Sequence, residues 1–264
     1  MRLDAHHSFS ERYPLASLET ILKRNRFDGS ILVDAAPPSD PPAFVRAVVR
    51  KTQAFVAADL GHWQEHQARF RGVCALAGDF GELAPRALTL DFSGPLTEIP
   101  TIACRYPDLR IAIPHLGKPE GEFDEHWADA LAAAARCPNV YCKLSALPFV
   151  RLPLSYEPGG HPGSHAHPSR EQRERSDAGA LSRRDREGAV VSWRVEDLRP
   201  LVEHALSVFG RSRLMFGSGW PAGLPDHPWK ESLAAFTQSI GARSIEFREL
   251  LLGGNAARFY GIAE

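Results

Sequence analysis

The sequence predicts an α/β fold, as a single and slightly trimmed (β/α)8 barrel of the TIM type. Segments of strand length alternate with segments of helical periodicity along most of the 264 residues. Several strand segments are continuous apolar runs, which is typical of parallel strands covered by helices. The length, with 44% hydrophobic residues, is enough to bury one substantial core. We therefore treat residues 1–264 as one domain.

Eight segments have the length and apolar content of buried strands. They are residues 2–6, 30–34, 54–58, 71–76, 87–91, 110–115, 139–144 and 213–217. In a barrel of this type the reactive side chains lie at the carboxyl ends of the strands. The residues that close these segments are therefore the first candidates for a site.

Helical periodicity fills the intervals between the strand segments. After Asp197, apolar residues recur at helical spacing, with Asp197 as the expected N-cap and Gly210 just past the end. A second helical pattern precedes Pro138 and contains the residues Phe123, Trp127, Ala130, Leu131 and Ala134. Both patterns predict helices that pack one apolar face on the sheet.

A polar segment at residues 153–189, between the seventh and eighth strands, interrupts this alternation. It is rich in Gly, Pro, Ser, Arg and Asp and has little apolar content with which to offset the entropy of ordering. We expect a mobile loop, which is either a lid over the site or an insertion without function. Its histidines, His161, His165 and His167, are expected to remain solvated rather than to bind a specific metal.

Composition excludes several classes of protein. The net charge of -1 gives no basic surplus for nucleic acid. The apolar segments are too short to cross a bilayer and the N-terminus does not resemble a signal peptide, so a cytoplasmic location is the expectation. The four cysteines show no paired metal spacing and are expected to be reduced. A homo-oligomer is compatible with this composition.

Seven motifs follow one another along nearly the whole chain. They are DAHHSF at residues 4–9, RYP at 12–14, FRGV at 70–73, HLGKP at 115–119, NVYCKLS at 139–145, LMFGSGWP at 214–221 and GGNAARFY at 253–260. This ordered set resembles the amidohydrolase-related family, which contains sugar-lactone and pyrone-dicarboxylate lactone hydrolases. The resemblance implies the barrel fold and a hydrolase ancestry, although ancestry does not fix activity.

Three positions depart from the pattern that the resemblance implies. Ser8 stands where metal-using relatives have the second histidine of the first strand, and Gly219 stands where the family has an aspartate. Pro114 replaces a residue that is acidic in many relatives. His7 does not compensate for Ser8, because neighbouring strand residues face opposite sides. We therefore expect no catalytic metal and no other cofactor.

Catalytic candidates remain at three strand ends. His115 closes the sixth strand and is expected to act as a general acid or base near neutral pH, although a core histidine is the alternative. His6 is a second candidate, with a smaller contribution. Asp34 ends the second strand and is either a base or a turn residue. Asp226 with His227 offers another base, or simply turn chemistry.

The candidates for substrate binding are charged, polar or aromatic residues near the carboxyl ends of the predicted strands. Lys118 and Lys143 favour an anionic partner, which for Lys143 is either the substrate or the carboxylate of Asp91. Ser8 offers a hydroxyl, and Trp220, with Phe9, offers an apolar wall.

Two functions remain open at this level. The first is an enzyme that acts without metal on a small anionic or carbonyl-rich molecule, by lactone-type hydrolysis or by an acid/base ring closure, isomerisation or elimination. The second is a catalytically inactive barrel that serves as a binding or scaffold protein. The polar groups retained at the strand ends favour the enzyme, because an inactive barrel has no physical need for them.

Overall fold

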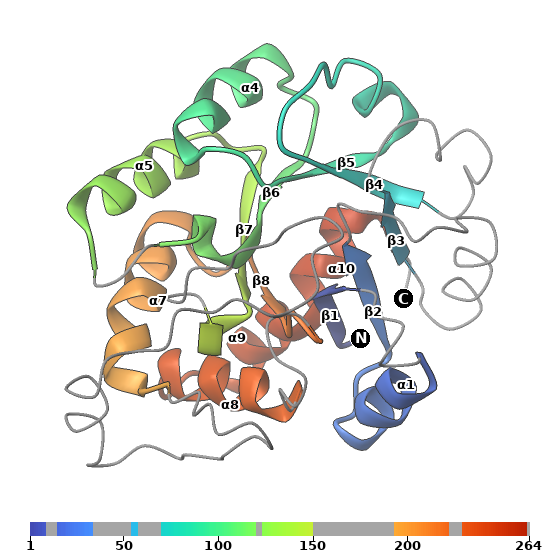
Figure 1. Cartoon of the computed structure of the whole chain (residues 1–264), viewed down its shortest axis with the longest axis vertical. Coiled ribbons are helices and arrows are strands. Elements are labelled where there is room, and N and C mark those ends of the chain that lie inside the picture. The colour runs from blue at the N-terminus through green and yellow to red at the C-terminus, as the bar shows by residue number, and fades with distance from the viewer. Residues whose placement is uncertain are drawn as a thin grey trace, which may run out of the picture.

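A computed structural model describes residues 1–8, 15–33, 54–57, 70–119, 123–149, 193–221 and 229–262. Eight strands form one parallel sheet in chain order (Figure 1). They are β1 (Leu3–His7), β2 (Gly29–Val33), β3 (Ala54–Ala57), β4 (Phe70–Ala75), β5 (Thr89–Phe92), β6 (Ile111–Ile113), β7 (Val140–Ser145) and β8 (Leu214–Gly217). The prediction of eight strands in a parallel α/β sheet is confirmed, with bounds that differ by one or two residues.

Backbone contacts join the two ends of this sheet. His7 forms a parallel bridge with Trp220, which lies just beyond β8. The amide of Ser8 donates to the carbonyl of Trp220 at 2.8 Å, and the amide of Gly219 donates to the carbonyl of His6 at 2.7 Å. The first strand therefore lies beside the segment that follows the last strand.

Helices surround the strands (Figure 1). The α-helices are α1 (Leu15–Arg24), α4 (Ile99–Arg105), α5 (Glu125–Ala135), α7 (Val195–Phe209), α8 (Trp229–Ser239), α9 (Ile245–Glu249) and α10 (Asn255–Tyr260). Short helical turns are η1 (Ala84–Arg86), η2 (Leu96–Glu98), η3 (Pro114–Gly117), η4 (Leu147–Phe149) and η5 (Leu250–Gly254). No helix among the described residues is long and apolar enough to cross a membrane.

Both expected helices are present, although the N-cap expected at Asp197 is shifted. Asp124 caps α5, because its carboxylate accepts from the amides of His126 and Trp127. Helix α7 begins at Val195, two residues before the expected cap Asp197, and its N-cap Arg194 makes no side-chain cap hydrogen bond. Gly210 ends α7 with φ 65, as predicted.

Two apolar clusters lie on the two sides of the sheet. The larger contains outward strand residues such as Leu90 and Leu144 with the inner faces of α5, α7 and α8. The smaller contains inward strand residues such as Ala112 and Met215, together with residues of α10. Helix α10 therefore packs on the inner face of the strands, whereas α5, α7 and α8 cover the outer face.

An irregularity in β1 changes which residues face inward. Asp4 pairs with Ser30 and His7 pairs with Leu32, so three steps along β1 match two steps along β2. This extra residue is a β-bulge, which interrupts the alternation of side chains. As a result both Ala5 and His6 lie on the inner side, between outward-facing Asp4 and His7.

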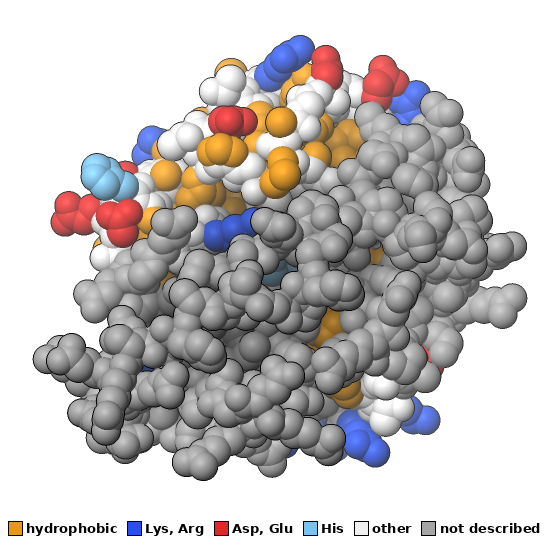
Figure 2. Space-filling view, viewed as in Figure 1, with side chains coloured by type: hydrophobic (Ala, Val, Ile, Leu, Met, Phe, Trp, Pro, Cys, Tyr) orange, Lys and Arg blue, Asp and Glu red, His pale blue; other side chains and the backbone are white. Residues whose placement is uncertain are grey.

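The described part of the surface carries charges of both signs. On the face shown in Figure 2, the described acidic and basic side chains are interspersed with apolar ones.

Candidate functional site

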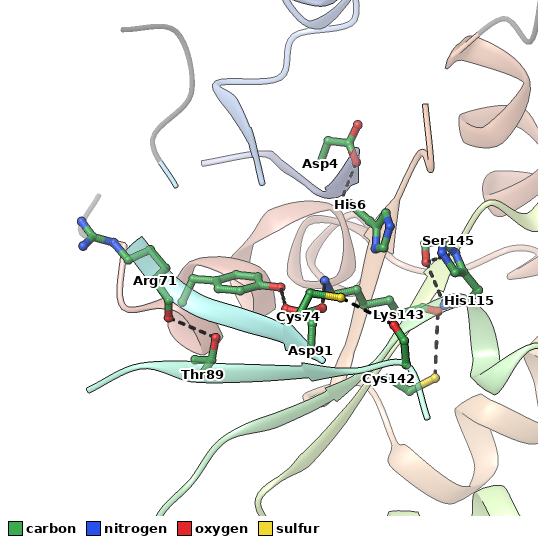
Figure 3. Close-up of polar contacts among 12 residues, drawn as sticks. Asp4, His6, Arg71, Cys74, Thr89, Asp91, His115, Cys142, Lys143 and Ser145 are labelled. Atoms are coloured by element: carbon green, nitrogen blue, oxygen red, sulfur yellow. Dashed lines mark hydrogen bonds and ion pairs between the residues drawn. The ribbon is translucent and has the colours of Figure 1, made fainter. Parts of the chain in front are cut away.

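Two histidines meet at the carboxyl ends of the strands. His6 comes from β1 and His115 follows β6 directly, and their ring centroids lie 4.3 Å apart with the planes tilted by 57°. His6 is 5% exposed. Figure 3 shows both rings on the same side of the strands, next to Ser145 at the end of β7. Three strands that are distant in sequence thus contribute one polar cluster.

Ser145 holds His115 through two contacts. Its Oγ accepts from the backbone amide of His115 at 3.0 Å and lies 2.9 Å from Nδ1 of the same residue. Ser145 is fully buried, so water cannot replace these partners at low cost. Sequence reasoning missed Ser145, although its place two residues after Lys143 at a strand end would have indicated the same inward face.

The backbone around His115 adopts an unusual conformation. Four consecutive residues are left-handed, with φ of 52 at His115, 56 at Leu116, 72 at Gly117 and 56 at Lys118. Left-handed backbone is costly for residues other than glycine, and such residues cluster at functional sites. Trp127 stabilises this turn by donating its Nε1 to the carbonyl of Leu116 at 2.8 Å.

Burial disfavours the charged form of both imidazoles. Burial, aided by the charges of Lys118 and Lys143, lowers the pKa of His115 to about 3. Burial, with His115 and Lys143 nearby, also holds the pKa of His6 well below its ordinary value. A cationic imidazole is disfavoured beside two lysines, and the expectation that His115 exchanges its proton near neutral pH stays a prediction.

Small residues of β8 leave space for this cluster. A Cβ on Gly217 would lie 2.7 Å from Cβ of His6 and 2.8 Å from Cβ of Ser145. A Cβ on Gly219, which has φ 68, would lie 2.6 Å from Cβ of Ala146. Ala146, whose backbone closely approaches the glycine, thus limits which residue can stand at 219.

Asp4 supports the site from the outer side. Its carboxylate accepts from the amides of His6 at 3.2 Å and Ser218 at 2.8 Å, and from Nε1 of Trp229 at 2.7 Å. Burial raises the pKa of Asp4, while these hydrogen bonds act in the opposite direction. The carboxylate joins β1, the end of β8 and α8, and so fixes the position of His6.

His7 takes no part in the cluster. Its Nδ1 lies 2.6 Å from Oγ of Ser30 on β2, and burial lowers its pKa to about 3. The sequence-based inference that His7 cannot replace the missing second histidine agrees with this placement.

A second polar cluster lies deeper, on the inner face of the strands. Lys143 of β7 forms an ion pair with Asp91 of β5, and both side chains are fully buried. Tyr260 of α10 donates its hydroxyl to Asp91 at 2.8 Å, and its ring centroid is 5.3 Å from Nζ of Lys143. Of the two partners that the sequence allowed for Lys143, the structure supplies the internal carboxylate. The role of Tyr260 was not predicted.

The other predicted binding residues occupy different environments. Lys118 is exposed at the rim, and Ser8 is half-buried beside Trp220. Trp220 is 5% exposed and packs in the cluster outside the sheet, so its role as a wall for substrate stays a prediction. The remaining predicted residues, Asp34, Phe9, Asp226, His227 and the segment 153–189, lie outside the described residues.

The described side chains are a poor fit for a catalytic metal. Among the residues that the structure describes, no group of three His, Cys, Asp or Glu side chains could hold a metal ion. The two imidazoles at the strand ends lie near lysine charge, and Nδ1 of His115 is engaged with Ser145. A divalent cation prefers more ligands and a negative surrounding. An anion or a carbonyl oxygen fits this cluster better.

A comparison with protein families identifies the ancestry of this chain. The family model described as Amidohydrolase matches residues 96–262, which is more than half of the chain. This chain belongs to the amidohydrolase family. The match includes the segments that carry His115, Lys143 and Gly219, so the predicted resemblance is confirmed over the second half of the barrel.

This amidohydrolase is similar to two curated proteins over most of its length. It is 28% identical over 288 residues to L-fucono-1,5-lactonase of Burkholderia ambifaria, covering 93% of this chain and 84% of the relative. It is 27% identical over 186 residues to the protein y4mH of Sinorhizobium fredii, covering 69% of this chain. The match spans 50% of that relative, so the chain corresponds to about half of its length.

Solved structures show the same fold. An amidohydrolase of Burkholderia multivorans with bound zinc is 22% identical, has a TM-score of 0.72, and is covered completely in both chains. At this identity the likeness concerns the fold alone, and the zinc belongs to that protein.

Proposed function

We propose that this amidohydrolase-family protein is an enzyme that hydrolyses a lactone or a closely related cyclic ester without a catalytic metal. We infer that its parallel sheet closes as a (β/α)8 barrel, which the contacts of His7 and Gly219 across the two ends support. The substrate is a small anionic or carbonyl-rich molecule. The similarity to an L-fucono-1,5-lactonase supports this substrate class.

The pair of neutral imidazoles at the strand ends carries the proposal. His6 and His115 lie 4.3 Å apart, and lysine charge acts on both rings. Hydrolysis of a lactone builds negative charge on the carbonyl oxygen as water adds. Hydrogen bonds from neutral imidazoles and the charge of nearby lysines stabilise that negative charge, whereas the lysine charge disfavours a metal cation.

Each predicted residue has a role in this proposal. His115 acts on the substrate carbonyl, His6 forms a polar wall beside it, and Lys118 attracts an anionic substrate at the rim. Asp34, which follows the last residue of β2, is the carboxylate that we propose as the base for water. Ser8 would line the substrate, and the Lys143–Asp91 ion pair would lie beneath it. The role of Trp220 as an apolar wall stays a prediction, because its side chain packs outside the sheet.

One experiment distinguishes lactone hydrolysis from the alternative acid/base reactions and from a binding-protein function. The purified protein is incubated with sugar lactones and other cyclic esters, and acid release is followed with a pH indicator. We expect turnover that His115→Ala reduces by roughly a hundredfold to a thousandfold, as for the loss of one oxyanion donor, and that His6→Ala reduces less. Full turnover in His115→Ala together with its abolition in His6→Ala would reverse our assignment. Binding without turnover of any lactone or cyclisable carbonyl compound would favour a binding protein.

A metal test accompanies the assay. We expect elemental analysis of the active protein to show no stoichiometric zinc, manganese or iron, and chelator to leave turnover unchanged. One tightly held metal per chain, removed together with activity, would contradict the proposal.

A further inference from the structure

The hydroxyl of Ser145 has two neighbours among the described residues, and both belong to His115. The backbone amide of His115 is a donor only, so Oγ must accept at the 3.0 Å contact. The second contact, 2.9 Å to Nδ1, can run in either direction, because a neutral imidazole carries its proton on one nitrogen or the other.

Counting hydrogens distinguishes the two directions. If Nδ1 carried the proton, Oγ would accept twice, and its own hydrogen would point at no acceptor in the described part of the chain. Ser145 is fully buried, so that hydrogen would be left without water as well. If instead Oγ donates to Nδ1, the hydroxyl is satisfied in both directions, and the ring proton lies on Nε2.

We propose that Ser145 is a positioning residue that fixes His115 as the neutral tautomer with its proton on Nε2. The left-handed turn from His115 to Lys118 and the hydrogen bond from Trp127 to Leu116 hold the backbone in place for this contact. Nδ1 faces the serine, and the N–H of Nε2 is the group left to meet a ligand.

The proposed tautomer suggests how His115 contributes to lactone hydrolysis. This catalytic consequence rests on the proposed function. A neutral imidazole with Nε2–H is a hydrogen-bond donor, so His115 would stabilise the negative carbonyl oxygen rather than remove a proton from water. Ser145 would act only through His115. Its loss should therefore lower kcat more than it raises KM.

Nuclear magnetic resonance can read the tautomer directly, without substrate. Long-range proton–nitrogen correlation of nitrogen-15-labelled protein at neutral pH distinguishes protonated from unprotonated ring nitrogens. His115→Gln identifies the signals of His115 by their disappearance. We expect Nε2 of His115 to be protonated and Nδ1 unprotonated in the wild type. In Ser145→Ala, both signals should shift as the second tautomer becomes populated, and Ser145→Cys should shift them less because a weak donor remains.

The second buried serine–histidine pair supplies a matched control. Ser30→Ala removes the hydroxyl beside His7, where the nitrogen-to-oxygen distance is 2.6 Å. We expect Ser30→Ala to shift the signals of His7 and to leave those of His115 unchanged. With a lactone substrate, Ser145→Ala should lower kcat by roughly tenfold to a hundredfold with a smaller change in KM.

Two results would overturn the assignment. One is a wild-type spectrum in which Nδ1 of His115 carries the proton, and this measurement does not depend on any variant folding. The other is an unchanged pair of His115 signals in folded Ser145→Ala. A protein that shows the expected tautomer but hydrolyses no lactone would contradict the proposed function and leave the role of Ser145 intact.

Discussion

At the scale of one residue, the surroundings of Gly219 leave no room for a side chain. Its φ of 68 disfavours any side chain, and a Cβ there would overlap Ala146 at 2.6 Å. Ala146 itself has φ 52, so the alanine of this contact also holds a costly left-handed backbone. The identity of the residue at 219 is therefore coupled to the loop after β7.

We predict that Gly219→Ala destabilises the protein more than left-handed strain alone explains. Gly241→Ala is the control, because Gly241 has φ 67 and no atom within 4 Å of an added Cβ. We expect about 1–2 kcal/mol for Gly241→Ala and roughly 1–3 kcal/mol more for Gly219→Ala, since the second also overpacks. Urea unfolding measures both. Equal losses would show that Ala146 moves aside without cost.

Gly219→Asp should fail to create a metal or hydrolytic site for the same reason. Combining it with Ala146→Gly removes the overlap, and we expect the double variant to recover part of the stability lost by Gly219→Asp. A single Gly219→Asp variant with wild-type stability would contradict this coupling.

Buried His7 gives a prediction for pH at the same scale. Its pKa is lowered from 6.5 to about 3, so the unfolded chain binds more protons than the folded chain between these values. Stability from this group is fully present above about pH 6.5 and is lost as pH falls toward 3, by up to about 1.4 kcal/mol per pH unit.

Thermal melting from pH 7 to pH 4 tests that sign. We expect His7→Gln to show a shallower loss of stability with acid than the wild type, whatever its stability at pH 7. His126→Gln, at an exposed position of α5, is the control and should keep the wild-type slope. If the stability of His7→Gln falls with acid as steeply as that of the wild type, His7 is not buried in its neutral form.

At the scale of elements, Asp4 connects three parts of the fold. Its carboxylate accepts hydrogen bonds from β1 itself, from Ser218 after β8 and from Trp229 at the start of α8. Because all three donors are fixed in the backbone or in a buried indole, losing the carboxylate would leave several donors unpaired. The two ends of the sheet then lose a side-chain link.

We predict that Asp4→Ala lowers the free energy of unfolding by about 3–5 kcal/mol, since hydrogen bonds to a charged group contribute about 1.5–3 kcal/mol each and are not additive. Trp229→Phe, which removes only the indole donor, should cost less. Asp129→Ala, at an exposed position of α5, should be nearly neutral. Denaturant unfolding measures these differences. A cost for Asp4→Ala as small as that of Asp129→Ala would contradict this role.

At the scale of the whole molecule, a hydrogen bond to a buried ion pair joins helix α10 to the inner face of the strands. Tyr260 donates to Asp91, which also pairs with Lys143, and burial together with that carboxylate raises the pKa of Tyr260 well above its ordinary value. This cluster links β5, β7 and α10, which are far apart in sequence.

We predict that Lys143→Met destabilises the protein by about 3–5 kcal/mol, because it leaves Asp91 buried without its partner. The double variant Asp91→Leu/Lys143→Met should recover most of that loss, since an apolar pair often replaces a buried ion pair without cost. Chemical denaturation of both singles and the double measures the coupling. Strictly additive losses would show that the pair is not a stabilising unit. A stable Lys143→Met that only raises KM would support the substrate role instead.

The sequence by itself determined the α/β class, the eight strands and the family. These features follow from local patterns: apolar runs of strand length, helical periodicity, and motifs such as HLGKP at residues 115–119. It also determined which residues end the strands, and therefore that His6 and His115 were candidates. It could separate His7 from His6, because side-chain direction alternates along a strand.

The tertiary structure alone decided how these groups meet. The partner of Lys143, the contact of Ser145 with His115 and the overlap of residue 219 with Ala146 all join segments that are distant along the chain. The neutral state of His115 was equally hidden, because its pKa depends on burial and on the nearby lysines rather than on its neighbours in sequence. Local periodicity specifies which face a side chain occupies, but distances and dielectric surroundings arise only when the strands pack.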